Sequence, residues 1–241
     1  MYYYTFDGTF EGFLTVIFYI YKNKEQPQDI AVAPGSLPLF ASARPVTTRR
    51  DLAARVAAGI RQKMGEISYR RTYYVFLSDY EGAYLKIYHY LDLGFQQTKK
   101  ELHNHLTDST VAYMQKVSQQ VTLESHRLKG LLRFQKQEGF FYAPCSPRHD
   151  VLELLAGHFS RRLDKQNWLI HDIGRGKAVV CADGNWQLAD LKQARLPANE
   201  EPYRALWQQY FSAINIDERR NPKQQKSYMP VRYWEFLPEM E

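Results

Sequence analysis

The chain has 241 residues, 44% of them hydrophobic and 15% aromatic, and its 32 Lys and Arg exceed its 26 Asp and Glu to give a net charge of +6. This length allows one large domain or two small ones, and the composition excludes collagen-like, low-complexity and broadly disordered classes. The longest largely apolar run, Phe13 to Ile20, has 8 residues, whereas a membrane-spanning helix needs about 20.

The N-terminus has neither a basic region nor a small-residue cleavage site, so we expect no signal peptide. Cys145 and Cys181 are the two cysteines, 36 positions apart and outside any Cys-x-x-Cys spacing. They provide neither a disulfide framework nor a zinc cluster. We therefore expect a cytoplasmic protein with two free thiols, no metal, no cofactor and no membrane association.

The first half of the chain is predicted to be mainly helical. Residues 2–6 favour a strand, and Asp7 and Gly8 then form a turn. Thr9 is a candidate cap for the helix that follows. The spacing of apolar residues predicts helices over 10–22, 51–64 and 107–129, and two short helices between 69 and 94 with a break near 79–82. Residues 23–38, rich in proline, are predicted as a loop with room for one short strand.

The second half of the chain is predicted to combine short strands with helices. Short β-rich runs predict strands over 131–134, 140–143, 168–173, 178–182 and 186–188. Apolar periodicity predicts helices over 150–163 and 202–215, and the aromatic tail at 228–234 is expected to dock on the body of the protein. The fold class is α+β, with a mainly helical N-terminal part and a small antiparallel sheet with an inserted helix in the C-terminal part. We expect one domain over 1–241, divisible into subdomains 1–129 and 130–241.

Positive charge is concentrated in two stretches. Arg44 to Arg71 holds eight basic residues against two acidic ones, and Arg127 to Lys177 holds ten against five. Tyrosine and phenylalanine are interleaved with these cations, a pattern that suits a phosphate backbone with stacked bases. The alternative is a pair of ordinary solvated helix faces.

Two clusters carry candidate chemistry. Glu124, His126, Arg127 and Arg133 lie close together in sequence, where the arginines suit phosphate binding and the histidine suits proton transfer. The same residues also fit a charged helix end without catalytic function. His103 and His105 flank Asn104 in the letters of a nuclease signature, but the paired strands of such a metal site are missing, so we predict no metal.

His171 and Asp172 close a predicted strand, and a carboxylate beside a histidine can tune it as an acid or base. Neighbours on a strand point to opposite faces, however, so the two side chains need not meet. A buried pair between Asp172 and Arg161 or Arg162 is an equal alternative. The weak candidates for catalysis are therefore Glu124, His126, His171 and Asp172.

Six ordered segments together resemble a known family. They are Phe6–Leu14, His126–Phe134, Tyr142–Pro144, His158-Phe159-x-x-Arg162, Trp168–Asp172 and Pro230–Trp234. The chain resembles, over essentially its whole length, an uncharacterised bacterial family of probable DNA-metabolism proteins. That family is associated with a putative radical-SAM DNA-repair protein, and a similar domain is fused to some uracil-DNA glycosylase-like proteins. The resemblance implies a role in DNA repair or modification and a radical-SAM partner that holds its own iron–sulfur cluster, but it assigns no catalytic residue.

Three functions remain open. The preferred one is an accessory protein that binds nucleic acid, DNA more than RNA, and acts with the radical-SAM partner. Its candidate phosphate ligands are Arg127, Arg133, Arg161, Arg162 and Arg232, and its candidate stacking residues are Trp168 and Trp234. The others are a protein-interaction partner without nucleic-acid contact, and an enzyme, a hydrolase or glycosylase, that acts directly on a nucleic acid.

Overall fold

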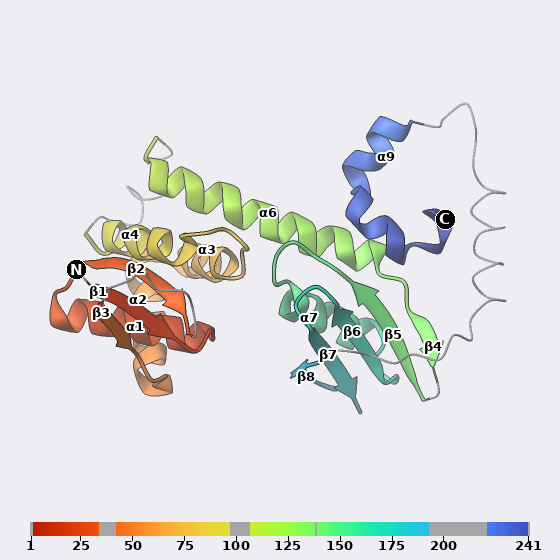
Figure 1. Ribbon diagram of the computed structural model, residues 1–241, viewed down its shortest axis with the longest axis horizontal. Helices are drawn as coiled ribbons and strands as arrows, with labels where there is room; N and C mark the ends of the chain where they lie inside the picture. The colour runs from red at the N-terminus through yellow and green to blue at the C-terminus, as the bar shows by residue number, and fades with distance from the viewer. Residues whose placement is uncertain (1, 34–41, 97–106, 138, 193–220, 241) are drawn as a thin grey trace. The chain divides into compact units, whose positions relative to one another are not determined.

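The computed structural model describes residues 2–33, 42–96, 107–137, 139–192 and 221–240, and its fold is α+β (Figure 1). The chain divides into two compact units, an N-terminal unit, Met1–Thr122, and a C-terminal unit, Leu123–Glu241. The helix predicted over 202–215 and the stretch His103–His105 lie outside the described residues. None of the described helices combines the length and the apolar character that crossing a bilayer requires.

The N-terminal unit contains a three-stranded parallel sheet of β1 (Tyr2–Phe6), β2 (Pro27–Val32) and β3 (Ser42–Pro45), with β1 in the centre. The expectation of a mainly helical N-terminal part was therefore incomplete. Strand β3 reads Ser-Ala-Arg-Pro, without a β-branched or aromatic residue, and β2 starts with proline. Neither has a strong local strand signal, and both depend on β1 for their pairing.

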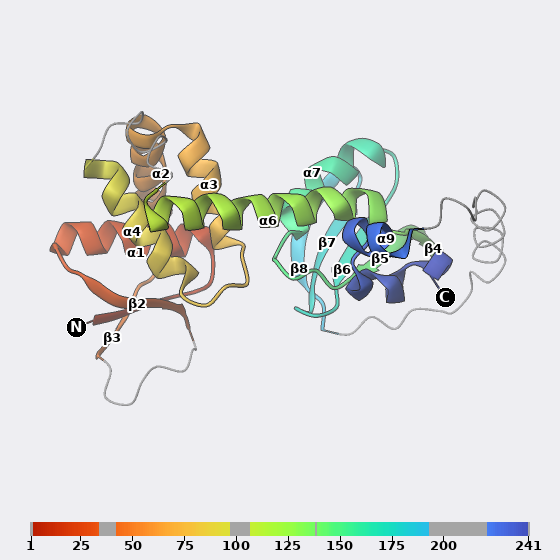
Figure 2. The ribbon, with the colours of Figure 1, turned by 90° about the horizontal axis from the view of Figure 1, so that it is seen from above.

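Five helices accompany this sheet in the described residues of the N-terminal unit. They are α1 (Phe10–Asn23), α2 (Arg50–Met64), α3 (Glu66–Phe76), α4 (Ala83–Gln96) and the first part of α6 (Ser109–Leu131). Figure 2 shows α1 to α4 on one side of the sheet. Aromatic rings fill the space beneath them, where Phe13 lies 6.0 Å from Phe6 and 5.7 Å from Phe76 between ring centroids. The helices predicted in this unit are thus present.

A polar junction joins the end of β1 to two helices. Asp7 accepts hydrogen bonds from the backbone nitrogen of Thr9 at 3.0 Å and from Thr48 Oγ1 at 2.7 Å. Thr9 Oγ1 in turn accepts from the backbone nitrogen of Gly12 at 2.9 Å, which caps α1. The turn and the cap predicted from sequence are confirmed, and Thr48 connects them to the segment before α2.

The C-terminal unit contains a five-stranded sheet. Its strands are β4 (Gln135–Gln137), β5 (Phe140–Cys145), β6 (Trp168–Asp172), β7 (Lys177–Ala182) and β8 (Asn185–Asp190), in sequential order. The sheet is mixed, because β5 and β6 run parallel while the other neighbours are antiparallel. The prediction of an antiparallel sheet was wrong at this pair. Helix α7 (Leu152–Arg162) lies between β5 and β6 in the chain and provides the crossover that a parallel connection needs.

The first strand of this sheet was also predicted too early. Helix α6 continues to Leu131, and β4 begins only at Gln135. Leu128 and Leu132 are both buried, so the apolar run at 131–134 completes the buried face at the end of the helix instead of starting a strand.

The C-terminal segment folds back onto its unit. It forms α9 (Pro222–Tyr228) and two short 3-10 helices, η2 (Val231–Phe236) and η3 (Pro238–Met240). Tyr233 and Leu237 are buried, and the indole of Trp234 donates to the carbonyl of Met229 at 2.9 Å. The expectation that this tail docks on the body is confirmed.

Candidate functional site

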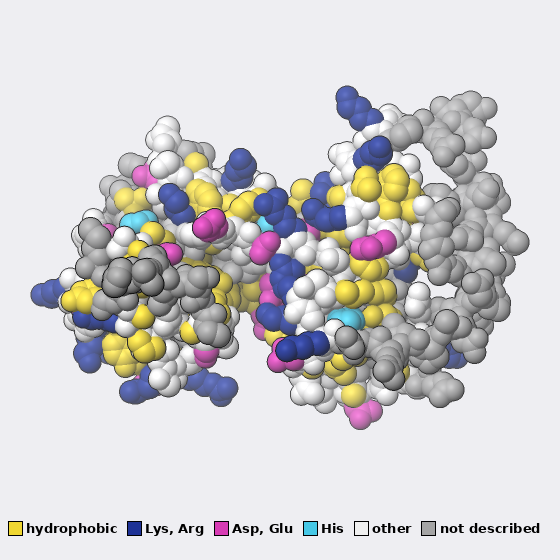
Figure 3. Space-filling model, viewed as in Figure 1, with side chains coloured by type: hydrophobic (Ala, Val, Ile, Leu, Met, Phe, Trp, Pro, Cys, Tyr) yellow, Lys and Arg dark blue, Asp and Glu magenta, His cyan; other side chains and the backbone are white. Residues whose placement is uncertain are grey.

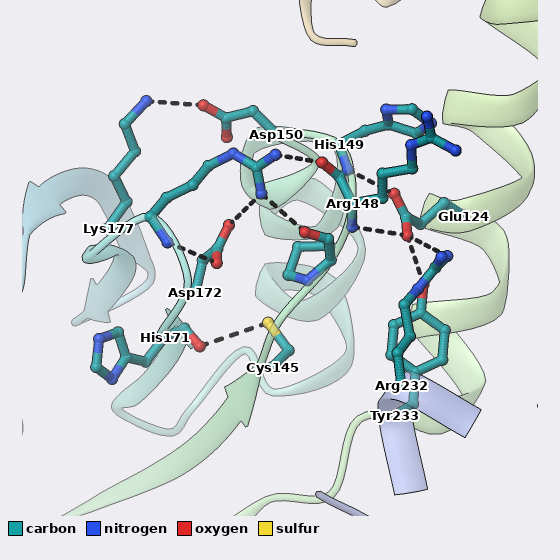
Figure 4. A network of polar contacts seen from close by, with 12 residues as sticks. Glu124, Cys145, Arg148, His149, Asp150, His171, Asp172, Lys177, Arg232 and Tyr233 are labelled. Carbon is teal, nitrogen blue, oxygen red and sulfur yellow. Dashed lines mark hydrogen bonds and ion pairs between the residues drawn. The ribbon is translucent and has the colours of Figure 1, made fainter. Parts of the chain in front are cut away.

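Glu124 on α6 is the centre of a buried polar cluster (Figure 4). It is 3% exposed and accepts four hydrogen bonds. The donors are the backbone nitrogens of Arg148 at 3.0 Å and His149 at 2.8 Å, the guanidinium of Arg232 at 2.7 Å and the hydroxyl of Tyr233 at 2.5 Å. Burial, together with the bond to Glu124, raises the pKa of Tyr233. Because four donors converge on it, this carboxylate joins α6, the segment after β5 and η2, and these contacts are structural.

Asp172 is the centre of a second cluster in the same unit (Figure 4). It is fully buried and accepts from the backbone nitrogen of Arg175 at 3.1 Å and from its guanidinium at 3.0 Å. Arg175 also donates to the carbonyls of Pro147 and Arg148. Burial raises the pKa of Asp172, against the opposing effect of Arg175. The arginine that pairs with Asp172 is thus Arg175, and neither Arg161 nor Arg162 is bonded to it among the described residues.

His171 lies on the other face of β6 from Asp172, as the alternation of a strand requires. Its Nδ1 is 2.9 Å from the hydroxyl of Tyr142, and its Nε2 is 2.9 Å from the carbonyl oxygen of Leu191. A carbonyl only accepts, so Nε2 carries a proton, and in the neutral ring Nδ1 accepts from the tyrosine. Both ring nitrogens are therefore occupied. His126, by contrast, is exposed on α6 and is not joined to Glu124 or to His171 by any bond among the described residues.

Three of the predicted phosphate-binding arginines hold the C-terminal segment. Arg127 donates to the carbonyl of Ser227 at 2.8 Å, Arg133 forms an ion pair with Glu239, and Arg232 pairs with Glu124. The charges of Arg133 and Arg232 are thus balanced by carboxylates more than a hundred positions away in the chain, whereas Arg127 contacts a neutral carbonyl. The remaining two, Arg161 and Arg162, are exposed at the end of α7.

The two predicted stacking residues are placed differently. Trp168 is 1% exposed, and its ring packs against Phe159, 6.4 Å between centroids. Its indole nitrogen has no hydrogen-bond partner among the described residues. Trp234 is half-buried and is held by its bond to Met229. Neither ring lines the groove described next.

A groove of about 490 Å³ gathers basic and aromatic side chains in the C-terminal unit. We call it the basic groove and define it by Lys129, Arg133, Phe134, Phe141, Phe159 and Arg162. No Asp or Glu is among the described residues that line it. Lys129 and Arg162 make no ion pair within the described parts of the chain, whereas the charge of Arg133 is balanced by Glu239. The groove thus presents two cations, without an ion pair to any described residue, beside phenyl rings.

A histidine close to the groove is affected by the same cations. Burial lowers the pKa of His158 on α7, and the cations of Lys129, Arg162 and Arg161 lower it further. On the face drawn in Figure 3, by comparison, Lys and Arg side chains are scattered among hydrophobic and acidic ones and form no continuous basic surface. Cations are therefore gathered locally around this part of α6 and α7.

The basic groove was found only in part from the sequence. Arg133 and Arg162 were predicted as phosphate ligands, but Lys129, Phe134 and Phe141 were missed. The signal was present in the segment Lys129-Gly-Leu-Leu-Arg133-Phe134, where cations and an aromatic residue follow one another. That Phe141 and Arg162 join this segment depends on the pairing of β5 and the packing of α7, which the sequence does not state.

Metal and thiol chemistry find little support in the described residues. Among them, no group of three or more His, Cys, Asp or Glu side chains is arranged to hold a metal ion. Cys145 and Cys181 are both free and buried. Burial raises the pKa of Cys145, so its thiol stays protonated and is a poor nucleophile.

Comparison with known proteins gives a family but no function. No curated protein matches the chain, and no solved structure matches it. One family model matches residues 81–239, which include all of the C-terminal unit except its last two residues and all of the basic groove. Because this match covers more than half of the sequence, the chain belongs to the family described as a domain of unknown function, DUF4130.

Proposed function

We propose that this protein binds nucleic acid through the basic groove. One observation carries the proposal: Lys129 and Arg162, two cations without ion pairs among the described residues, line the same groove as phenyl rings, and no described carboxylate lies among them. Phosphate contacts supply most of the affinity of a nucleic-acid complex, because each one releases condensed counterions. Arg161, exposed beside Arg162, extends the same positive charge along α7.

The proposal is tested by fluorescence anisotropy of the full chain with labelled single-stranded and duplex DNA, from about 50 to 200 mM salt. We expect affinity that falls steeply with salt. Replacing Lys129→Gln and Arg162→Gln together removes two phosphate contacts and should reduce the slope of log K against log salt by about 1.4 to 1.8. Lys223→Gln with Lys226→Gln on α9 removes the same two charges away from the groove lining and should leave the slope near that of the wild type. Absence of binding at low salt, or an unchanged slope in the double variant, would refute the proposal.

The resemblance described above supports a finer proposal, that the nucleic acid is DNA and that the protein acts with a radical-SAM protein. The support that the resemblance gives to this finer proposal is an association and not a mechanism. RNA of the same sequence is the competitor in the binding experiment, and weaker binding of DNA than of RNA would contradict the first part.

A second candidate function is binding to a protein partner, favoured by strand β8. This is the last strand of the described sheet, and Trp186 and Leu188 are exposed on one of its faces. Exposed apolar residues on a sheet edge are typical of contact with another chain. Co-purification with the radical-SAM protein tests it. Trp186→Ser with Leu188→Ser should abolish the complex. Ile67→Ser, which changes a still more exposed apolar residue in the N-terminal unit, should retain it.

A further inference from the structure

The aromatic lining of the basic groove adds information that its cations do not. Phe134 precedes β4, Phe141 lies on β5, and both rings are half-exposed. Phe159 of α7 is buried behind them, with its ring edge-to-face to Phe134 at 5.0 Å between centroids. A solvated phosphate backbone gains no binding free energy from such apolar surface. These rings therefore indicate a second kind of contact with the ligand.

The aromatic lining is anchored to the buried part of the unit. Phe141 on β5 is paired in register with Trp168 on β6, and Trp168 packs against Phe159. Phe134 is fixed by the same Phe159. A platform anchored in this way loses little side-chain entropy when a flat ligand is placed on it.

The remaining lining is suited to the edge of a heterocycle. Gln166 lines the groove after α7, and its amide offers both a hydrogen-bond donor and an acceptor. At about 490 Å³ the groove is within the range of pockets for small organic ligands, roughly 300 to 1,000 Å³. It therefore has room for a nucleotide and not for a duplex.

Single-stranded and duplex nucleic acids differ in whether their base faces are exposed. In a duplex the faces are stacked on one another, and only base edges and the backbone reach a protein. A single strand, or a base turned out of the helix, exposes a face that can lie on an aromatic side chain. Phenyl rings next to cations thus match an unstacked nucleotide.

We infer that the basic groove holds an unstacked nucleotide of single-stranded nucleic acid, with its base on Phe134 and Phe141 and its phosphates beside Lys129 and Arg162. This inference rests on the proposed function and deepens it by naming the strand form. It also assigns stacking to two phenylalanines in place of the tryptophans expected from the sequence.

Three labelled probes test it on the full chain at one salt concentration. They are a single-stranded oligothymidylate, an abasic oligomer with the same number of phosphates, and a duplex of the same length. We expect the oligothymidylate to bind about tenfold or more tightly than the abasic oligomer, since stacking on an aromatic residue contributes a factor of this size. The duplex, whose base faces are covered, should bind more weakly than the oligothymidylate.

Matched variants locate the effect. Phe134→Leu and Phe141→Leu should each reduce oligothymidylate affinity severalfold and leave abasic binding and the salt slope unchanged, while Phe134→Tyr, which keeps the ring, should retain affinity. Phe140→Leu is the control, because Phe140 is the neighbouring half-buried ring on β5 and does not line the groove. Urea unfolding of each variant, followed by tryptophan fluorescence, verifies that it is folded.

The outcomes separate this inference from the proposed function. Equal binding of the abasic and base-bearing strands, with a salt slope that still depends on Lys129 and Arg162, overturns the inference and leaves the proposed function intact. Preference for duplex overturns it in the same way. If no probe binds at low salt, both fail.

Discussion

Among single residues, Glu124 should be the most sensitive to substitution, because four hydrogen-bond donors share its buried carboxylate. In Glu124→Gln the amide nitrogen would replace one carboxylate oxygen and face a buried N–H, and Arg232 would lose its counter-charge. We expect the free energy of unfolding of the C-terminal unit to fall by about 2 to 4 kcal/mol. All four tryptophans lie in this unit, so urea unfolding followed by tryptophan fluorescence measures it directly.

The matched control for Glu124 is Glu235→Gln. Glu235 lies on η2 beside the same cluster in sequence but is exposed, so its substitution should change the free energy of unfolding by less than about 0.5 kcal/mol. Equal effects of the two substitutions would show that the buried cluster contributes nothing beyond a surface charge.

Two histidines of the C-terminal unit predict how its stability depends on pH. Burial lowers the pKa of both His149 and His158, and nearby cations lower that of His158 further. As the pH falls through the ordinary histidine value, about 6.5, the unfolded chain therefore takes up protons that the folded chain resists. We expect the C-terminal unit to be less stable to urea at pH 5.5 than at pH 7.5. His158→Gln should reduce this difference, and a difference as large as that of the wild type would contradict the assignment.

Residue types alone could not reveal which charges are available to a ligand. The pairs Arg232–Glu124 and Arg133–Glu239 join positions 108 and 106 apart in the chain. The sequence pattern identifies the arginines as a positively charged set, and only the folded chain shows that Arg133 and Arg232 are paired with carboxylates. That Lys129 and Arg162 line one groove also depends on the folded chain, and no local motif encodes it.

At the scale of elements, the junction after β1 explains a glycine in α1. A Cβ on Gly12 would overlap Asp7 Oδ1 and lie 2.8 Å from Thr48 Oγ1. Gly12→Ala should therefore separate Asp7 from Thr48 and cost the N-terminal unit about 1 to 3 kcal/mol. Far-UV circular dichroism during urea unfolding measures this loss, since the unit has no tryptophan.

Gly59 in α2 is the matched control for Gly12. A Cβ at this position meets no atom within 4 Å, so Gly59→Ala adds only helix propensity and should stabilise the unit by about 0.5 to 1 kcal/mol. We expect the two substitutions to change the free energy of unfolding of the N-terminal unit in opposite directions. A neutral Gly12→Ala would show that the Asp7 junction yields without cost.

Elements with a strong internal pattern were predictable, and those defined by their partners were not. Helices α1, α2 and α7 carry apolar residues at helical spacing, and their predicted bounds lie within two residues of the observed ones. Strand β3 has four residues and no strand-forming composition, and it exists because β1 offers an unpaired edge. The parallel pair β5–β6 follows from the position of α7 in the chain, so the predicted inserted helix already contained the information that the sheet is mixed.

At the scale of the whole chain, the division into two units predicts how cooperatively the protein unfolds. Each has its own buried residues, and the boundary between them falls inside α6, after Thr122. If each unit is stabilised by its own core, a substitution in one should shift only the transition of that unit. We expect Glu124→Gln to lower the urea midpoint of the tryptophan signal and Gly12→Ala to leave it unchanged.

The reciprocal measurement uses hydrogen exchange on the same two variants, read at β1 for the N-terminal unit and at β6 for the C-terminal unit. Gly12→Ala should accelerate exchange at β1 alone, and Glu124→Gln at β6 alone, because local stability follows the contacts of each cooperative part. Equal acceleration at both strands in both variants would mean that the units unfold together through α6. In that case the groove, which begins at Lys129 on this helix, would depend on the N-terminal unit for its stability, and binding experiments would require the full chain.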